Sequence, residues 1–120
     1  ESLPKIEKDI LELTLNKKPV LVSVYGEQNA GKTTFIENLF KTLTGKKYNV
    51  VKSEGYSNPL SIEELKKPEF DCDIFFFHYG FTTKIKGLND ISIVIYNPSI
   101  HSEPNETFDY KIINTNSKIK

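Results

Sequence analysis

Residues 26–33 constrain the fold of this chain more than any other feature. They read Gly-Glu-Gln-Asn-Ala-Gly-Lys-Thr and match the pattern G-x-x-x-x-G-K-[ST] without deviation, a pattern that joins a buried strand to a helix. Residues 20–25 form a nearly unbroken apolar and β-branched run, as in a parallel strand that is covered on both faces. Residues 33–44 carry apolar side chains at helical spacing. The sequence therefore predicts a strand, a glycine-bounded loop and a helix in that order.

The rest of the chain alternates between strands and helices. A charged segment with an apolar stripe predicts an N-terminal helix over residues 5–15. A capping box at residues 61–64 predicts a short helix that Pro68 ends, and Gly45 is expected to cap the helix that follows the loop. Further strands are predicted at 48–52, 73–77 and 91–96, with an edge strand at 108–113. This order predicts a three-layer α/β fold with a mainly parallel sheet.

The length indicates one domain. A chain of 120 residues can bury a core without disulfides or metals, so residues 1–120 are expected to fold together. Residues 114–120 are predicted to be a polar tail. The connection over 78–90 is short for a full helix, so we expect one abbreviated crossover.

The composition excludes several classes of function. Lys+Arg and Asp+Glu both number 16, so the formal net charge is zero, and every basic residue is a lysine. A balanced chain lacks the positive excess that nucleic acid or a membrane surface requires, and no apolar run approaches the roughly 18 residues of a membrane span. The single cysteine, Cys72, rules out an internal disulfide and fits a reducing compartment. We therefore expect a cytoplasmic chain that binds neither nucleic acid nor membranes.

The loop over residues 26–33 has the chemistry of a phosphate-binding loop. Gly26 permits the turn out of the strand, and Gly31 permits close approach of a ligand to the backbone. Backbone N–H groups and the N-terminus of the following helix then face the same anion. Lys32, expected to face solvent, adds charge for the β- and γ-phosphates, and the Thr33 hydroxyl is placed to bind Mg²⁺. The predicted nucleotide contacts here are Gly26, Asn29, Ala30, Gly31, Lys32, Thr33 and Thr34.

A carboxylate that would help to hold the metal is expected at the end of a strand next to the loop. The strand over 73–77 is followed instead by His78, and Asp71 and Asp73 lie at its beginning, which is the wrong end. Glu54, right after the second strand, is the best-placed acid. It is predicted to hold the metal, through a water, or to orient a nucleophile; the alternative is a solvated loop glutamate.

His78 has two interpretations as well. It stands where the acid is expected, so it could contact a substrate phosphate or the attacking group, and an imidazole could transfer a proton near neutral pH. The favoured interpretation is a strand-end histidine whose hydrogen bonds are satisfied. The catalytic roles are therefore assigned to Lys32 and Glu54.

Two features bear on the base of a nucleotide. Asn97 follows the strand over 91–96 and is the candidate for binding a purine edge, because its amide offers a donor and an acceptor. Asn-Pro is also an ordinary opening of a turn. The sequence Asn-Lys-x-Asp that gives many GTPases their guanine specificity is absent, so GTP and ATP both stay open. The aromatic residues are expected in the core or at a dimer contact: Phe75, Phe76, Phe77, Tyr79 and Phe81.

Residues 24–39 and 45–52 resemble the opening of a known family. The run Val-Tyr-Gly through Gly-Lys-Thr-Thr-Phe-Ile-Glu-Asn-Leu, then Gly-Lys-Lys-Tyr-Asn-Val-Val-Lys, is similar to the molybdopterin-guanine dinucleotide biosynthesis adaptor proteins, the MobB family. The Lys-Thr-Thr tripeptide also suits the wider group of P-loop proteins. The resemblance implies a P-loop NTPase-like fold, GTP binding, a homodimer and a partner protein in cofactor biosynthesis. It carries over onto residues 26–34 and, more loosely, onto Lys52.

Three functions follow from these features. The first is a nucleotide-binding adaptor in molybdenum cofactor guanylylation whose NTPase activity is weak or depends on a partner, because no arginine or strand-end acid offsets transition-state charge. The second is a small-molecule kinase, which usually needs arginines that this chain lacks. The third is a module that holds nucleotide without hydrolysing it. The resemblance favours the first function, with GTP over ATP, and Mg²⁺ is the expected metal.

Overall fold

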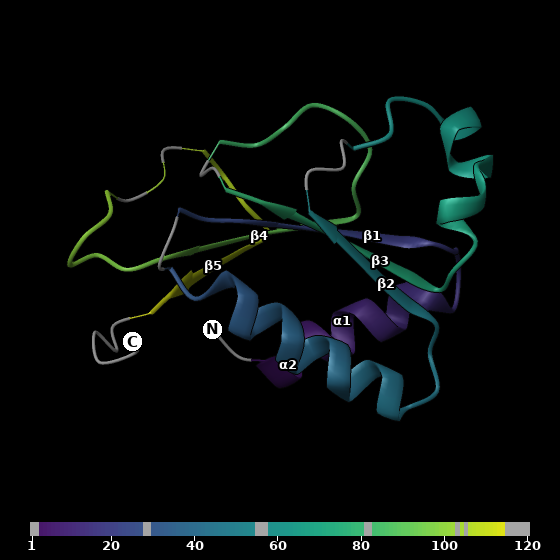
Figure 1. The fold of residues 1–120 in the computed structure, drawn as a ribbon, viewed down its shortest axis with the longest axis horizontal. Helices are drawn as coiled ribbons and strands as arrows, with labels where there is room; N and C mark the ends of the chain where they lie inside the picture. The colour runs from purple at the N-terminus through teal and green to yellow at the C-terminus, as the bar shows by residue number, and fades with distance from the viewer. Residues whose placement is uncertain are drawn as a thin grey trace.

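Five parallel strands form one sheet through the middle of the molecule. The computed structural model describes residues 3–27, 30–54, 58–80, 83–102, 104 and 106–114. Within these residues the strand order is β2-β3-β1-β4-β5, and every neighbouring pair is parallel (Figure 1). The strands are β1 Val20–Tyr25, β2 Val50–Glu54, β3 Ile74–Tyr79, β4 Ile91–Tyr96 and β5 Tyr110–Ile113. The predicted parallel sheet is confirmed, and all five strands end at one edge, called here the carboxyl edge.

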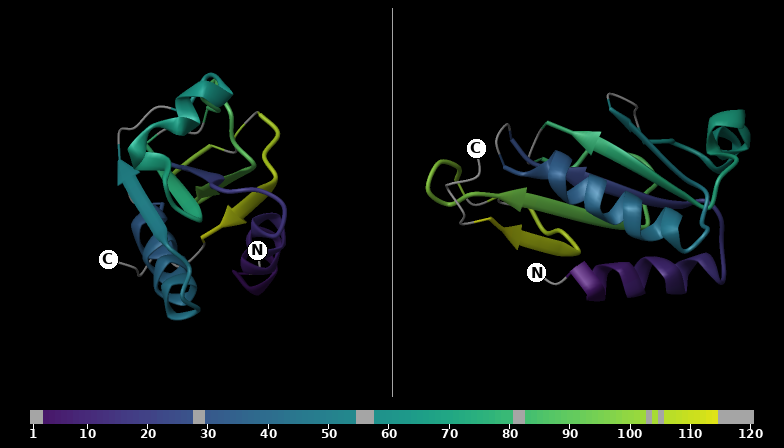
Figure 2. Two further views of the ribbon diagram at one scale, coloured as in Figure 1. Left: turned by 90° about the vertical axis from the view of Figure 1, so that its right-hand side faces the viewer. Right: turned by 60° about the horizontal axis from the view of Figure 1, so that its bottom comes forward.

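Both α-helices cover the same face of the sheet. Helix α1 (Leu3–Thr14) and helix α2 (Lys32–Gly45) lie next to each other below the sheet in Figure 1, and Figure 2 shows the same arrangement from two other sides. The helices predicted over 5–15 and 33–44 are thus confirmed. Their apolar stripes close an aliphatic core against the strands, and its fully buried members include Ile6, Ile10, Leu43, Val22, Val24, Ile74 and Ile93.

The opposite face is covered without α-helices among the described residues. Two 3₁₀ helices, η1 (Ile62–Lys66) and η2 (Pro68–Phe70), and the segment over 83–90 lie across it (Figure 1). The abbreviated crossover between β3 and β4 is therefore confirmed for residues 83–90, and the sheet has a layer on each face. This second core is largely aromatic and contains Tyr25, Phe70, Phe75, Phe77, Tyr79 and Phe108. The core placement predicted for residues 75–77 and 79 is confirmed, whereas Phe81 lies outside the described residues.

A buried asparagine ties the second layer to the sheet. The Tyr79 hydroxyl donates to Asn58 Oδ1 at 2.7 Å, and Asn58 Nδ2 donates to the Ile85 carbonyl at 3.3 Å. Burial raises the pKa of Tyr79 to about 12, so the hydroxyl stays protonated as a donor. Gly87 has φ +132°, and a Cβ there would lie 2.5 Å from Asn58 Cβ. The absence of a Cβ at Gly87 therefore allows the segment over 83–90 to pack against Asn58.

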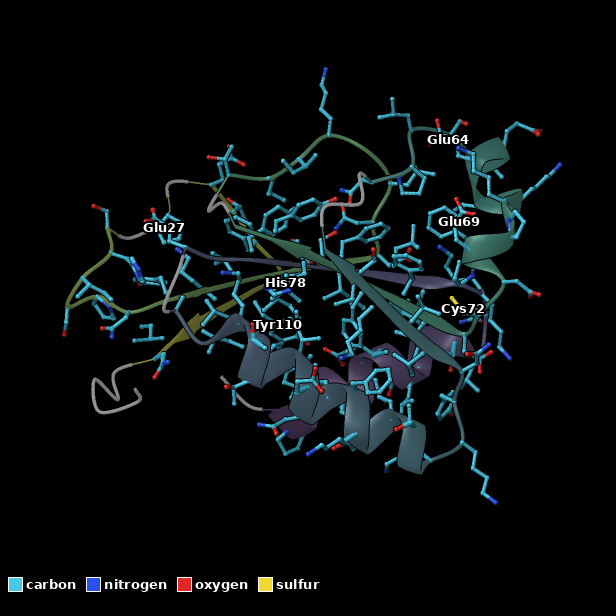
Figure 3. The ribbon with its side chains drawn as sticks, in the orientation of Figure 1. Glu27, Glu64, Glu69, Cys72, His78 and Tyr110 are labelled. Atoms are coloured by element: carbon cyan, nitrogen blue, oxygen red, sulfur yellow. The ribbon has the colours of Figure 1, made fainter. Side chains whose placement is uncertain are left out.

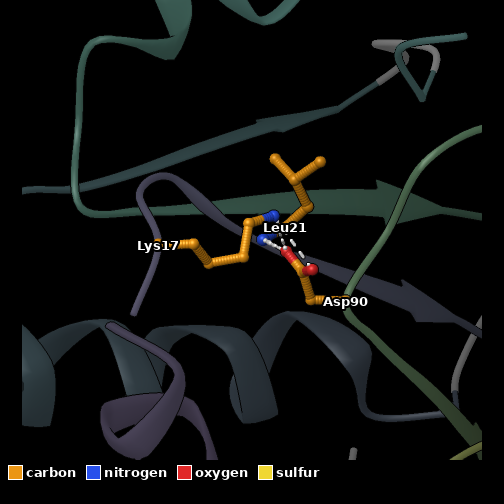
Figure 4. A network of polar contacts seen from close by, with 3 residues as sticks. All are labelled: Lys17, Leu21 and Asp90. Atoms are coloured by element: carbon orange, nitrogen blue, oxygen red, sulfur yellow. Dashed lines mark hydrogen bonds and ion pairs between the residues drawn. The ribbon is translucent and has the colours of Figure 1, made fainter. Parts of the chain in front are cut away.

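All five strands begin at one edge of the sheet, called here the amino edge. Three aspartates at this edge accept hydrogen bonds from backbone N–H groups. Each precedes a strand and accepts a backbone N–H at 2.8 Å from the neighbouring chain segment: Asp73 from Asn49, Asp90 from Leu21 and Asp109 from Ser92. Figure 4 shows the middle case, in which Asp90 also pairs with Lys17 at 2.9 Å. The hydrogen bond from Asn49 lowers the pKa of Asp73. All three carboxylates therefore satisfy backbone N–H groups at this edge of the sheet.

The C-terminus of α2 differs from its prediction. Gly45 is the last helical residue, not the cap, and the left-handed residue after the helix is Lys47 with φ 72°. The reason is a hydrogen bond from Tyr48 N to the Leu43 carbonyl at 3.2 Å, which closes the turn three residues beyond Gly45. Strand β2 consequently starts at Val50 and not at residue 48.

The predicted capping box does not form. The Ser61 side chain makes no capping hydrogen bond, and Glu64 Oε1 accepts from Leu60 N at 3.1 Å. The segment winds as the short 3₁₀ helix η1, whose residues are not buried. Cys72 is buried, and burial raises the pKa of its thiol to about 11. No helix among the described residues is both long and apolar enough to cross a membrane.

Candidate functional site

Residues 26–33, called here the glycine loop, leave the central strand β1 at the carboxyl edge. In the strand order, β2 and β3 lie on one side of β1, and β4 and β5 lie on its other side. The chain runs from β1 to β2, returns to β3 next to β1, and then passes β1 to reach β4. The winding direction reverses around β1, and open parallel sheets bind ligands at such a switch point, outside the carboxyl ends of the strands. Of the predicted contacts, Asn29 lies outside the described residues.

Both glycines of the loop are required by packing. A Cβ at Gly26 would lie 2.6 Å from the Ile95 carbonyl oxygen, which is backbone and cannot turn away. Gly31 has φ +95°, a conformation that glycine adopts without strain, and a Cβ there would lie 2.8 Å from Asn114 Nδ2. The loop is therefore held tightly between β4 and the residue that follows β5.

Asn114 is a contact that the sequence did not reveal. Its Nδ2 donates to the Ala30 carbonyl at 3.1 Å, and its backbone N–H donates to the Tyr96 carbonyl at 2.9 Å. Sequence analysis assigned Asn114 to a polar tail, because nothing local distinguishes it from the asparagine and lysine residues around it. Its position at the end of β5 brings it to the loop across the sheet.

Lys32 is buried, which corrects the expectation that it faces solvent. Its side chain is 9% exposed, and its Nζ donates to the Glu27 carbonyl at 3.1 Å. The absence of a Cβ at Gly26 makes room for the Lys32 side chain, because a Cβ at that position would lie 3.0 Å from Lys32 Cγ. The ammonium group therefore lies within the glycine loop, with its stem packed along the first residue of that loop.

The N-terminus of α2 is open toward this edge. Gly31 caps it without a side-chain hydrogen bond, and the first turn contains no acidic residue. Thr33 and Thr34, in that first turn, are exposed. A helix N-terminus carries partial positive charge and unpaired N–H groups, so together with Lys32 it forms an environment suited to an anion.

A polar cleft lies beside the glycine loop. It has a volume of about 220 Å³ and is lined by Thr33, Ile36, Glu37, Lys52, Ser53 and His78; we call it the His78 cleft. Figure 3 shows His78 between the sheet and α2. Lys52 pairs with Glu37 and lies 4.7 Å from the centre of the Phe40 ring. A second cleft of about 220 Å³ lies on the β5 side of α2 and is lined more by apolar side chains, including Ile95, Ile112 and Ile113.

The other predicted site residues are distributed along the same edge. Glu54 is the last residue of β2 and stands opposite His78 in the pairing of β2 with β3; its side chain lies outside the described part of the chain. Asn97 is buried, and its Oδ1 accepts from Ser99 N at 2.9 Å, as in an Asx turn. Its backbone N–H donates to His101 Nδ1 at 3.1 Å. Asn97 is not among the residues that line either cleft.

Of the two residues predicted to hold the metal, Thr33 and Glu54, the structure describes the side chain of Thr33, which is exposed. Among the described residues no group of three or more His, Cys, Asp or Glu side chains is arranged to hold a metal ion. Mg²⁺ does not need such a group, because it keeps several waters and is often bound through one or two side chains and the phosphates of a substrate. The donor set at Thr33 is therefore compatible with Mg²⁺ bound together with a phosphate chain.

Another hollow lies at the amino edge, between α1 and strands β4 and β5. Its volume is about 640 Å³, and Asp90 and Asp109 contribute to its wall. Both carboxylates are already engaged by backbone N–H groups of Leu21 and Ser92. The carboxyl edge thus remains the stronger candidate site, because its polar groups converge on one loop.

Comparisons with known proteins do not add to this geometry. No protein-family model matches the chain, and searches of curated proteins and of solved structures gave no match. The residues of the glycine loop and their surroundings therefore carry the functional proposal below.

Proposed function

We propose that this chain binds a purine nucleoside triphosphate with Mg²⁺ at the glycine loop. The observation that carries the proposal is the meeting of Lys32, the left-handed Gly31 and the uncapped N-terminus of α2 at the end of the central strand. Each of these features favours an anion, and the octapeptide spacing matches that of phosphate-binding loops.

The chain's own residues would act as follows. The backbone N–H groups of Gly31 and of the first turn of α2 would donate to phosphate oxygens, whereas that of Ala30 donates to the Glu27 carbonyl at 3.2 Å. The Lys32 ammonium would exchange its hydrogen bond to the Glu27 carbonyl for one to the β- or γ-phosphate. Thr33 would hold Mg²⁺, which when bound neutralises phosphate charge.

The more specific proposal comes from the resemblance to the MobB family. It favours GTP over ATP and an adaptor role in molybdenum cofactor guanylylation, with a homodimer and a partner protein. The chain contains no arginine, so the charge of a phosphoryl-transfer transition state is poorly offset from within it, and slow or partner-stimulated turnover is expected. A small-molecule kinase and a non-hydrolysing nucleotide-binding module are the alternatives.

Thermal unfolding with and without nucleotide tests the proposal. A ligand at about 100 times its Kd should add roughly 2.7 kcal/mol to the free energy of unfolding, which for a domain of this size raises the Tm by several degrees. We expect this shift with Mg²⁺ and GTP, a smaller one with ATP, and none in Lys32→Ala. Lys41→Ala is the matched control, because Lys41 is an exposed lysine of the same helix.

Each outcome separates the alternatives. A GTP-selective shift in the wild type and in Lys41→Ala supports the adaptor proposal. An ATP-selective shift favours the kinase. If neither nucleotide shifts the Tm, or if Lys32→Ala responds like the wild type, nucleotide binding at the glycine loop is refuted.

A further inference from the structure

Apart from Thr33, the residues that line the His78 cleft take no part in the phosphate contacts proposed above. Thr33 belongs both to the glycine loop and to the wall of the cleft. The volume of about 220 Å³ leaves room for several waters, each of which occupies about 30 Å³ in the liquid. A small reactant in this cleft would therefore be a neighbour of phosphates bound at the loop.

The position of His78 follows from the alternation along β3. Ile74 and Phe76 belong to the core under the helices, so His78, two residues further, points to the same face toward α2. In the pairing of strands it stands opposite Val24 of β1 and Glu54 of β2. The imidazole therefore lies at the carboxyl edge, one strand away from the start of the glycine loop.

The chemistry of the cleft singles out one proton acceptor among its described side chains. The carboxylate of Glu37 is already engaged by the Lys52 ammonium in an ion pair. Thr33 and Ser53 are alcohols, which donate and accept hydrogen bonds but do not take up a further proton near neutral pH. An imidazole takes up a proton in this range, so His78 is the group suited to general-base catalysis.

We propose that the His78 cleft holds the attacking water of nucleoside triphosphate hydrolysis and that His78 accepts its proton. This inference rests on the proposed function. The water oxygen forms a bond to the γ-phosphorus, the bond from that phosphorus to the β,γ-bridging oxygen breaks, and the nucleoside diphosphate leaves with the bond's electron pair. The proton of the water passes to an imidazole nitrogen of His78 and is then released to solvent, leaving inorganic phosphate.

Phosphate release and nucleotide binding, measured side by side, test this inference. The variants are His78→Ala and His78→Asn, and each is first checked for a folded thermal transition. Kd for Mg²⁺-GTP is measured by calorimetry and phosphate release under single-turnover conditions from pH 5.5 to 8.5. Free imidazole is added to His78→Ala, because the truncation enlarges a cleft that is already open. His101→Ala is the matched control for the pH profile, because His101 lies outside the cleft.

We expect both His78 variants to keep Kd within about threefold and to lose phosphate release by about 100-fold or more. Free imidazole should restore part of the rate in His78→Ala, and the fall in rate at low pH should disappear in both variants but persist in His101→Ala. Wild-type-like release in His78→Ala, or no release from nucleotide-loaded wild type, overturns the inference and leaves the proposed function intact. Failure of the wild type to bind nucleotide overturns the proposed function itself.

Discussion

The two edges of the sheet use polar groups in opposite ways. At the amino edge, Asp73, Asp90 and Asp109 each accept a hydrogen bond from a backbone N–H of a neighbouring segment, so these carboxylates stabilise the fold. At the carboxyl edge, the N-terminus of α2 has no side-chain cap and no acid in its first turn. An open helix N-terminus beside a buried ammonium costs stability unless a ligand offsets it. The polar groups of the first edge stabilise the fold, whereas on our proposal those of the second edge bind a ligand.

The largest expected effect is that of Gly26→Ala. The new Cβ would meet the Ile95 carbonyl oxygen at 2.6 Å, so the loop or β4 must shift, with an expected loss of about 3 kcal/mol in the free energy of unfolding. The stabilisation by Mg²⁺-GTP should disappear as well. Urea unfolding with and without nucleotide measures both.

Gly45→Ala is the matched control for this substitution. No atom lies within 4 Å of a Cβ at Gly45, and the residue is helical, so the exchange should raise stability by about 0.5 kcal/mol and leave nucleotide binding unchanged. If the two variants behave alike, tight packing at Gly26 does not control the loop.

A change at the amino edge should separate stability from binding. Asp90→Ala removes the pair with Lys17 and leaves Leu21 N without its carboxylate partner, which should cost about 2 kcal/mol in the free energy of unfolding. The affinity for nucleotide in the folded protein should stay the same, which calorimetry below the unfolding transition checks. Asp9→Ala, in an exposed pair with Lys5, should cost less than about 0.5 kcal/mol. A large loss of affinity in Asp90→Ala would contradict the division between the edges.

Asn114→Ala tests the contact that holds the loop from β5. Loss of the hydrogen bond to the Ala30 carbonyl should cost about 1 kcal/mol in the free energy of unfolding. Because the Ala30–Gly31 peptide would lose its anchor, we also expect the Kd for Mg²⁺-GTP to rise several-fold, measured by calorimetry. The control is Asn38→Ala. Asn38 is an exposed residue of α2 and lines the cleft on the β5 side of that helix, which Asn114 also lines. Equal affinities in the two variants would mean that Asn114 serves the fold alone.

The smallest expected effect concerns pH and Asp73. Its pKa is lowered in the folded state, chiefly by the hydrogen bond from Asn49, with a smaller effect from Lys18. A lowered pKa gives stability that is fully present above the unfolded value near 4 and is lost as the pH falls through the folded value. The wild type should therefore lose more stability than Asp73→Asn when the pH falls below about 4. Parallel pH profiles for the two proteins would show that Asp73 contributes no such linkage.

Local patterns predicted most of the fold. The strands over 20–25 and 91–96 agree residue for residue with β1 and β4, because buried parallel strands have unbroken apolar runs. The glycine loop was recognised for a similar reason, since its spacing and both flanking elements are contiguous in sequence. The capping box at 61–64 does not form because the carboxylate of Glu64, the last residue of the pattern, accepts from the N–H of Leu60, which lies one residue before the pattern.

The features that the sequence could not predict depend on contacts between distant residues. Asn114 reaches Ala30 across 84 positions, and only the order of strands brings them together. The burial of Lys32 depends on the space left by Gly26. The placement of His78 against Thr33 likewise needs the crossover from β1 through α2 to β2, which no local pattern specifies.

An amide NMR titration with Mg²⁺ and a slowly hydrolysed GTP analogue tests the difference between the edges most directly. Assigned backbone signals report each edge separately in one experiment. We predict that the signals of Ala30, Gly31 and the first turn of α2 shift, while those of Asn49, Leu21 and Ser92 at the amino edge do not. Shifts confined to the amino edge, or no shifts at saturating analogue, would contradict the assignment of the carboxyl edge as the binding site.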